Sequence, residues 1–240
     1  MLLKRIYKKL KFLFTSKEKA YDFNKSNPLG GNGERVDINL SERVNFNALD
    51  IYQKNHFKRY EFAREIITPG DVCGDFACGT GYGTVMISRK AKLIIGADLN
   101  DKVITAITER YKKDSNVIFL NENLLDLSYY NYFDCIICFE TLEHFEETNV
   151  IKVLTIFRNA LKKNGKIIFS TPFMQEKSEE AIKMGFHLTF YISEQKIEEW
   201  LKKSGFKIDM IKYQNYDSHD IKDDLKNKEF IICVAQKEDN

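Results

Sequence analysis

The order of apolar runs along the chain is the feature that most restricts its fold. From Asn55 to Gly205, short runs rich in Val, Ile and Phe alternate with longer segments whose apolar residues recur every three or four positions. Short runs of this kind favour buried strands, and the longer segments favour helices that pack on them. Strands are expected at residues 71–77, 92–100, 116–120, 132–140 and 165–172, and helices at 55–67, 82–90, 101–113, 149–163 and 193–205. This alternation predicts a doubly wound, mainly parallel α/β sheet.

Two further apolar runs close the chain. Residues 206–214 and 229–237 are joined by a polar linker and can pair as a hairpin, which completes a seven-stranded sheet. A chain of 240 residues is long enough to enclose one substantial core. We therefore expect one main domain at 55–240, preceded at 1–54 by an N-terminal helical extension and a lid or linker.

The N-terminal extension carries the one strongly asymmetric stretch of charge. Residues 1–14 place leucine and isoleucine at helical spacing among Lys and Arg residues. Such a helix could lie on an anionic membrane surface, with residues 1–19 in peripheral contact at the inner face, or it could dock on its own domain or on a partner chain. The turn-rich segment Tyr21–Asn47 is expected to be a connection or a lid that shapes acceptor choice.

Overall charge and cysteine content restrict the class of partner. The 37 Lys and Arg residues against 35 Asp and Glu residues leave a net charge of +2, which gives no whole-molecule basis for binding DNA. Five cysteines without regular spacing, and no cleavable signal peptide, suit free thiols in a reducing cytoplasm. No apolar run approaches the roughly 20 residues that a bilayer span needs. A cytoplasmic protein is expected.

A glycine-rich stretch, "DFACGTGYG", links the first expected strand to the following helix. At such a turn the backbone can pass close to a ligand, and a Cβ at Gly79 or Gly81 would occupy the ligand's space. Asp98 ends the next strand 23 residues after Asp75, where a carboxylate can accept both hydroxyls of a ribose. The spacing differs from the dinucleotide pattern G-x-G-x-x-G, and an acid at Asp75 would repel a pyrophosphate but suits a ligand with an ammonium and a sulfonium group.

This stretch resembles motif I of the class I S-adenosylmethionine-dependent methyltransferases. Later segments resemble the other motifs of that family in the same order: "GADLN", "NVIFLNENLLDL", "YFDCIICFETLEH" and "LKKNGKIIFSTP". The resemblance implies a Rossmann-like methyltransferase fold and S-adenosyl-L-methionine as cofactor. It departs from the family at Ala77, where glycine is frequent, and at Asn123, where the usual residue is Asp.

The resemblance also implies cofactor contacts for individual residues. The methionine part would meet residues of the glycine loop, the ribose would meet Asp98 and Leu99, and the adenine would meet Asn123 and Leu124. Phe139 would lie near the sulfonium. Arg59, on the helix before motif I, is the candidate for the cofactor carboxylate, with a solvated helix charge as the alternative. The loop residues in question are Asp75, Ala77, Cys78, Gly79 and Gly81.

A possible metal site follows the fourth strand. Glu140, Glu143 and His144 are spaced i, i+3 and i+4, which on a helical turn brings the three side chains to one face, where they can hold a hard divalent cation. The pattern is similar to that of ubiquinone-biosynthetic O-methyltransferases and of small-RNA 2′-O-methyltransferases, where it binds magnesium or manganese. His187 is the candidate fourth ligand. The metal-free alternative makes His144 a general base and leaves the two glutamates as helix-terminus acids, with His187 structural.

A second ligand-like pattern is set aside. Cys135 and Cys138 form C-x-x-C inside an expected strand, where residues three apart point to opposite faces. A zinc site is not expected there.

These patterns together favour a small-molecule methyltransferase in which Glu143, His144 and His187 are catalytic. The chain looks most like bacterial methyltransferases of surface-polysaccharide and sugar-nucleotide pathways, which implies O-methylation of a sugar, a sugar nucleotide or a capsular or surface-glycan precursor. Four alternatives stay open: a quinone-precursor methyltransferase, an RNA 2′-O-methyltransferase, an NAD-dependent oxidoreductase and a non-catalytic cofactor-binding subunit. The oligomeric state is not indicated by any of these patterns.

Overall fold

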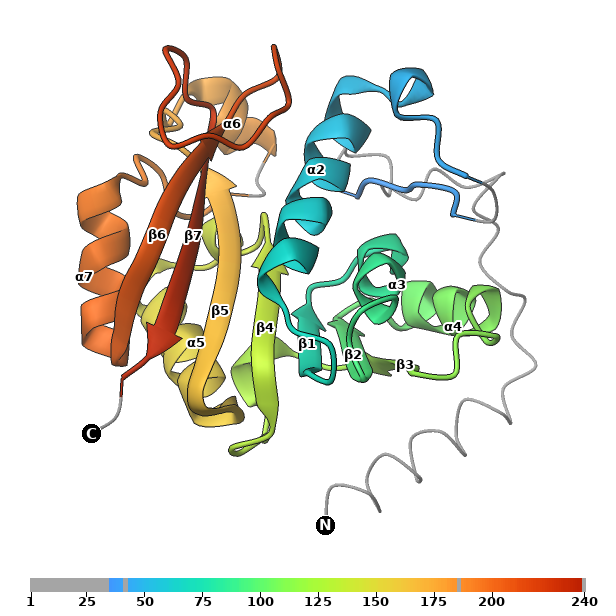
Figure 1. Cartoon of the computed structure of the whole chain (residues 1–240). Helices are drawn as coiled ribbons and strands as arrows, with labels where there is room; N and C mark the ends of the chain where they lie inside the picture. The colour runs from blue at the N-terminus through green and yellow to red at the C-terminus, as the bar shows by residue number, and fades with distance from the viewer. Residues whose placement is uncertain (1–34, 41–42, 185–186, 239–240) are drawn as a thin grey trace.

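The computed structural model describes residues 35–40, 43–184 and 187–238, and its centre is a seven-stranded sheet of order β3-β2-β1-β4-β5-β7-β6 (Figure 1). β1 to β5 pair in parallel, whereas β7 runs antiparallel between β5 and β6. The fold class, including the C-terminal hairpin, is therefore confirmed. The expected basic helix at the N-terminus lies outside the described residues. The strands are β1 (Val72–Phe76), β2 (Leu93–Asp98), β3 (Val117–Asn121), β4 (Phe133–Phe139), β5 (Leu161–Pro172), β6 (Phe206–Gln214) and β7 (Phe230–Lys237).

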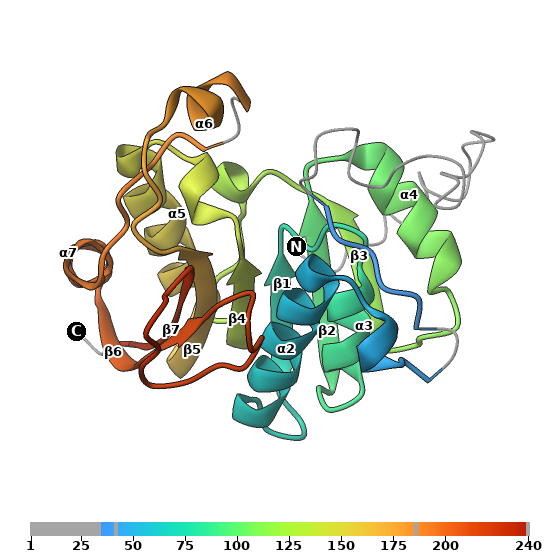
Figure 2. The ribbon, with the colours of Figure 1, turned by 90° about the horizontal axis from the view of Figure 1, so that it is seen from above.

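Helices cover both faces of this sheet (Figure 2). The α-helices are α2 (Ile51–Ile66), α3 (Tyr82–Ser88), α4 (Asp101–Arg110), α5 (Glu147–Ala160), α6 (Glu179–Met184) and α7 (Glu194–Ser204). The 3₁₀ turns are η1 (Phe46–Ala48), η2 (Leu124–Asp126) and η3 (Leu142–His144). Cys135 packs in the core under α2 and α3, and Cys138 packs in the core under α5 and α7, so these two cysteines face opposite ways as expected. All five cysteines are free and buried.

Several helix boundaries differ from the sequence-based expectation, and two of the differences have a clear local cause. α2 begins earlier than residue 55 because Asp50 caps it: the Asp50 carboxylate accepts the Gln53 N–H at 2.8 Å, and the Gln53 side chain accepts the Asp50 N–H at 2.9 Å. α5 ends at Ala160, and Leu161, expected in the helix, starts β5 beside Phe133. Apolar periodicity misses the start of α2 because the cap that sets it, Asp50, is polar. It misses the end of α5 because Leu161 is apolar and suits either a helix or a strand.

Among the described residues, no helix has both the length and the apolar character needed to cross a membrane.

Candidate functional site

The three glycines in and just after the loop that follows β1 serve two different purposes. Gly79 has φ +52°, and a Cβ built there meets no atom within 4 Å, so this glycine borders open space. At Gly81 a Cβ would lie 2.9 Å from the Phe119 ring, and at Gly83 it would lie 1.9 Å from the Tyr60 ring. The space expected for a ligand is therefore found at Gly79, whereas the other two glycines allow close packing inside the protein.

Ala77 shares the left-handed backbone of this loop. Its φ is +61°, a conformation in which a Cβ costs about 1–2 kcal/mol. The departure from glycine at this position is thus a strained one. Cys78 turns its side chain into the core, and its N–H donates to the Ala97 carbonyl at 3.0 Å. The loop is consequently tied to β2.

Asp75 lies beneath the glycine loop, with 1% of its surface exposed. Its carboxylate accepts the Tyr60 hydroxyl at 3.2 Å and the Thr84 hydroxyl at 2.6 Å, so it links β1 to α2 and α3. Burial raises the pKa of Asp75 to about 7, and the nearby charge of Asp98 acts in the same direction, against the lowering effect of the two hydroxyl donors. Phe139 is also buried, with its ring centroid 5.1 Å from that of Tyr60. The sequence patterns indicated neither Tyr60 nor Thr84 as a partner.

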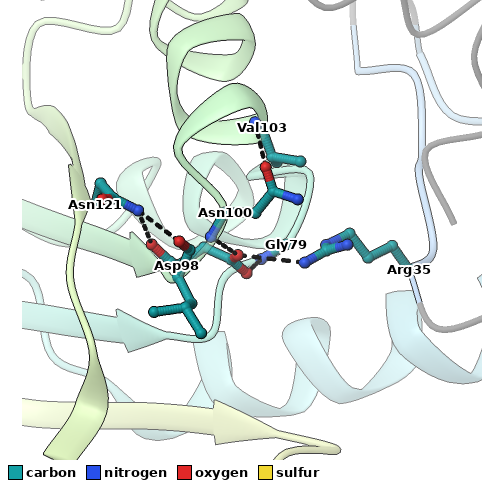
Figure 3. A network of polar contacts seen from close by, with 7 residues as sticks. Arg35, Gly79, Asp98, Asn100, Val103 and Asn121 are labelled. Carbon is teal, nitrogen blue, oxygen red and sulfur yellow. Dashed lines mark hydrogen bonds and ion pairs between the residues drawn. The ribbon is translucent and has the colours of Figure 1, made fainter. Parts of the chain in front are cut away.

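Asp98, at the end of β2, is the centre of a polar network (Figure 3). Its Oδ2 accepts the Gly79 N–H at 3.1 Å, and its Oδ1 accepts the Asn100 N–H at 2.9 Å. The guanidinium of Arg35 reaches Oδ1 at 3.4 Å. A carboxylate fixed in this way beside open space at Gly79 fits a ribose diol.

The residues that follow β2 and β3 border the position expected for adenine. Leu99 is 72% exposed, and the Asn121 side chain holds the Leu99 carbonyl at 2.7 Å. Asn123 caps η2 by accepting the Leu125 N–H at 3.0 Å, and the Leu124 side chain is buried in the core. Of these side chains, Leu99 and Asn123 are exposed at the edge of the sheet, whereas Leu124 points away from it. Asn121 was not indicated by the sequence.

Arg59 is fully buried, which rules out the alternative of a solvated helix charge. Its Nε donates to the Gln214 side chain at 2.8 Å, its Nη1 lies 3.3 Å from the Glu140 carboxylate, and its guanidinium stacks on Phe230 at 4.2 Å. Within the described part of the chain, Nη2 and the buried hydroxyl of Tyr82 lack a hydrogen-bond partner, and Nη1 has its ion pair with Glu140 but no hydrogen bond. Buried donors in this state fit an anion such as a carboxylate.

Glu140 does not take the position that helical spacing predicted. The turn after β4 is a 3₁₀ turn that begins only at Leu142, and Glu140 precedes it with φ +47°. Its carboxylate accepts the Ser170 hydroxyl at 2.6 Å and pairs with Arg59. Glu140 is therefore outside the ligand group formed by the other three candidates.

Glu143, His144 and His187 do come together, with ligand atoms all within 4.8 Å of one another. The Glu143 carbonyl accepts the N–H groups of Leu188 at 2.8 Å and Thr189 at 3.0 Å, which anchors the chain immediately after His187. Burial and the neighbouring His144 lower the pKa of His187 to about 4. The His187 ring is thus neutral at neutral pH, as a metal ligand must be.

Gln175 fixes the orientation of His187. Its side-chain oxygen lies 2.5 Å from His187 Nδ1, and because a neutral imidazole has one N–H, that proton belongs on Nδ1. The lone pair is then on Nε2, the arrangement typical of a histidine that binds a metal through Nε2. No sequence pattern indicated Gln175, since its partner is 12 residues away in an irregular segment.

Known proteins that are similar to this chain include methyltransferases. Residues 74–165 match a family described as a methyltransferase domain. The Bacillus subtilis (strain 168) protein YqeM, a provisionally named methyltransferase, is 24% identical over 98 residues, which is 40% of this chain and 40% of YqeM. The chain thus matches less than half the length of this curated relative.

Solved structures share the fold over most of the chain. The N-methyltransferase NodS from Bradyrhizobium japonicum WM9, in complex with S-adenosyl-L-homocysteine, has a TM-score of 0.62 at 14% identity, covering 81% of this chain and 91% of NodS. The [4+2]-cyclase SpnF has a TM-score of 0.61 at 16% identity, covering 78% of this chain and 81% of SpnF. The fold is therefore the Rossmann-like methyltransferase fold. Because SpnF is titled a cyclase, the fold alone does not define a reaction.

Proposed function

We propose that the chain is an S-adenosylmethionine-dependent methyltransferase that acts on an oxygen of a small molecule. The observation that carries this proposal is the pairing of two sites on neighbouring strands. β1 ends in the glycine loop beside Asp98, and its direct neighbour β4 leads into Glu143 and His144. Ligands of open α/β sheets bind at the carboxyl ends of the strands, so a cofactor and an acceptor would meet there.

The residues present fit the cofactor. Asp98 would accept ribose hydroxyls, the open space at Gly79 would admit the ligand, and the donors of Arg59 and Tyr82 would hold the cofactor carboxylate. When bound, the cofactor supplies a methyl group activated by a sulfonium. The chain's own contribution is to position and desolvate the acceptor oxygen in line with that methyl group.

The three-residue group fits a divalent cation. Glu143, His144 and His187 would hold it through one carboxylate and two imidazoles, and this donor set favours manganese over magnesium. A cation there would lower the pKa of an acceptor hydroxyl and orient vicinal oxygens. In the metal-free alternative His144 accepts the hydroxyl proton directly.

The favoured acceptor is a vicinal diol of a sugar, a sugar nucleotide or a surface-glycan precursor. A second candidate, an aromatic diol such as a quinone precursor, is favoured by apolar side chains beside the group. Leu188 follows His187, and Tyr191, whose N–H donates to the Gln175 carbonyl at 3.0 Å, is also exposed. Exposed apolar residues beside a polar site indicate a ligand with an apolar part.

The test combines methyl transfer with metal binding. Purified protein is incubated with methyl-labelled cofactor and a panel of sugars, sugar nucleotides and catechols, with chelator and after addition of Mn²⁺ or Mg²⁺, and label is followed by mass spectrometry. Glu143→Gln is compared with Glu176→Gln, which removes an exposed carboxylate nearby. The proposal expects a methylated diol that Glu143→Gln loses and Glu176→Gln retains.

Other outcomes separate the alternatives. Transfer that survives chelation favours His144 as a base. Cofactor binding without transfer to any acceptor favours a non-catalytic subunit, and binding of reduced nicotinamide instead of S-adenosylhomocysteine favours an oxidoreductase.

A further inference from the structure

Residues 35–40, here called the strap, cross the cofactor side of the molecule beside α2 (Figure 1). The Val36 carbonyl accepts the Thr80 hydroxyl of the glycine loop at 2.9 Å. The Asp37 carboxylate accepts two hydrogen bonds from Arg110 of α4, at 2.8 and 3.0 Å. The strap is therefore fixed to both elements that border the cofactor side.

Core packing anchors the strap further along. Ile38 is buried with Tyr60 and Tyr82, and Leu40 packs against the same cluster. The Asp37 carbonyl also accepts the Gln53 side chain of α2 at 2.8 Å. Because the following residues are held so firmly, the backbone of Arg35 has a defined position at the edge of the site.

Arg35 points from this position to Asp98 (Figure 3). Its Nη2 lies 3.4 Å from Oδ1, with the Arg35 side chain 27% exposed and the Asp98 side chain 8% exposed. The pair is thus open to solvent from the arginine side. A nearly buried carboxylate is costly without a compensating charge, and Arg35 supplies that charge.

The acceptor capacity of Asp98 limits what else can bind. A carboxylate offers about four lone-pair sites, two on each oxygen. The Asn100 N–H and Arg35 occupy Oδ1, and the Gly79 N–H occupies one site on Oδ2. A ribose diol that uses both oxygens needs one free site on each, so it needs the site that Arg35 takes on Oδ1.

We propose that Arg35 and a ribose compete for the same acceptor site on Asp98, so that an adenosine-containing ligand must displace Arg35 to bind. This inference rests on the proposed function, because it takes Asp98 as the ribose acceptor. Arg35 then lowers cofactor affinity while it stabilises the empty site. A partly exposed ion pair of this kind changes affinity by about two- to five-fold.

The experiment compares Arg35→Gln with Arg43→Gln, which removes an exposed positive charge a few residues after the strap. The dissociation constant of S-adenosylhomocysteine is measured by calorimetry at about 0.02 M and about 0.5 M salt, where screening differs strongly. Arg35→Gln is expected to bind two- to five-fold tighter than wild type at low salt and equally at high salt. Arg43→Gln is expected to follow wild type at both.

A second readout uses the same proteins. Arg35→Gln should lower the thermal midpoint of the empty protein and leave that of the ligand-saturated protein unchanged, because the pair exists only in the empty state. Weaker binding by Arg35→Gln would mean that Arg35 contacts the ligand directly and would overturn the inference, as would binding equal to wild type at low salt.

Asp98→Asn separates this inference from the proposed function. The proposed function expects Asp98→Asn to weaken S-adenosylhomocysteine binding strongly, with or without Arg35→Gln. If Asp98→Asn weakens binding and Arg35→Gln does not tighten it, the displacement alone is wrong. If neither wild type nor any variant binds the ligand, the proposed function and the displacement are both wrong.

Discussion

The cofactor half and the acceptor half of the site are built in different ways. Around Asp75 and Asp98, the carboxylates are held by backbone N–H groups and by hydroxyls of neighbouring elements, with glycines that allow close packing. On the acceptor side, Glu143 and His144 meet His187 from a distant segment that is irregular and bears exposed apolar residues. Glycine packing and backbone N–H groups thus organise the first half, and side chains from separate loops organise the second. The two halves should therefore respond differently to substitution.

The largest effect is expected from Gly83→Ala, which tests the close packing of the cofactor half. The new methyl group would lie 1.9 Å from the Tyr60 ring, and displacing that ring also disturbs its bond to Asp75. Overpacking of this degree should lower the free energy of unfolding by about 3 kcal/mol or more. Urea unfolding measures it.

Gly79→Ala is the matched control, because its methyl group meets open space. It should cost only about 1 kcal/mol, from the left-handed backbone, and should weaken S-adenosylhomocysteine binding more than it weakens the fold. Equal losses of stability in the two variants would contradict the division of roles among these glycines.

The next effect concerns the pH dependence of stability through Asp75. Its pKa rises from 3.8 to about 7 on folding, so between these values the folded protein holds a proton that the unfolded chain releases. Stability from this group is full below about pH 4 and is lost as the pH rises from there to about 7, and the loss between pH 5 and pH 7 alone is about 3 kcal/mol. Asp75→Asn should remove that slope when unfolding is followed from pH 5 to 8. Parallel curves for the two proteins would show that Asp75 keeps an ordinary pKa.

The sequence predicts features that depend on local patterns better than features that depend on contacts between separate segments. The mainly parallel seven-stranded sheet, the hairpin and Asp98 beside the glycine loop follow from local periodicity and spacing, and the structure confirms them. Glu140 was wrongly predicted to join the metal ligands because i, i+3 spacing assumes an α-helical turn. In the structure Glu140 has a positive φ and lies before the 3₁₀ turn η3. Gln175 and the role of Tyr60 depend on contacts between segments that no local pattern encodes.

Substitutions in the metal-ligand group should weaken metal binding in the acceptor half without changing ligand binding in the cofactor half. His187→Ala should weaken Mn²⁺ binding by about 100-fold, and Gln175→Ala by about tenfold, because the first removes a ligand and the second releases the ring that carries it. Electron paramagnetic resonance of free Mn²⁺ measures both, with Glu176→Gln as control. S-adenosylhomocysteine affinity should not change in any of the three. A parallel loss of ligand affinity would show that the halves are one coupled unit.

The smallest effect is expected at Ala77. This residue has a left-handed backbone conformation, which in the rest of the loop is adopted by the glycines Gly79 and Gly81. Ala77→Gly removes a strain of about 1–2 kcal/mol but adds freedom to the unfolded chain, so the free energy of unfolding should rise by about 0.5–1 kcal/mol. Asn164→Gly, at φ +60° in an exposed position of β5, should gain less because Asn tolerates this conformation. Glu140→Gly should lose stability despite its φ of +47°, since the Glu140 side chain bonds Ser170 and Arg59. Urea unfolding measures the stability of the three variants. We expect the positive φ at Glu140 to be retained because it allows the contacts of the Glu140 side chain, whereas the positive φ at Ala77 allows no such contact. An equal gain in the free energy of unfolding for Glu140→Gly and Ala77→Gly would contradict this distinction.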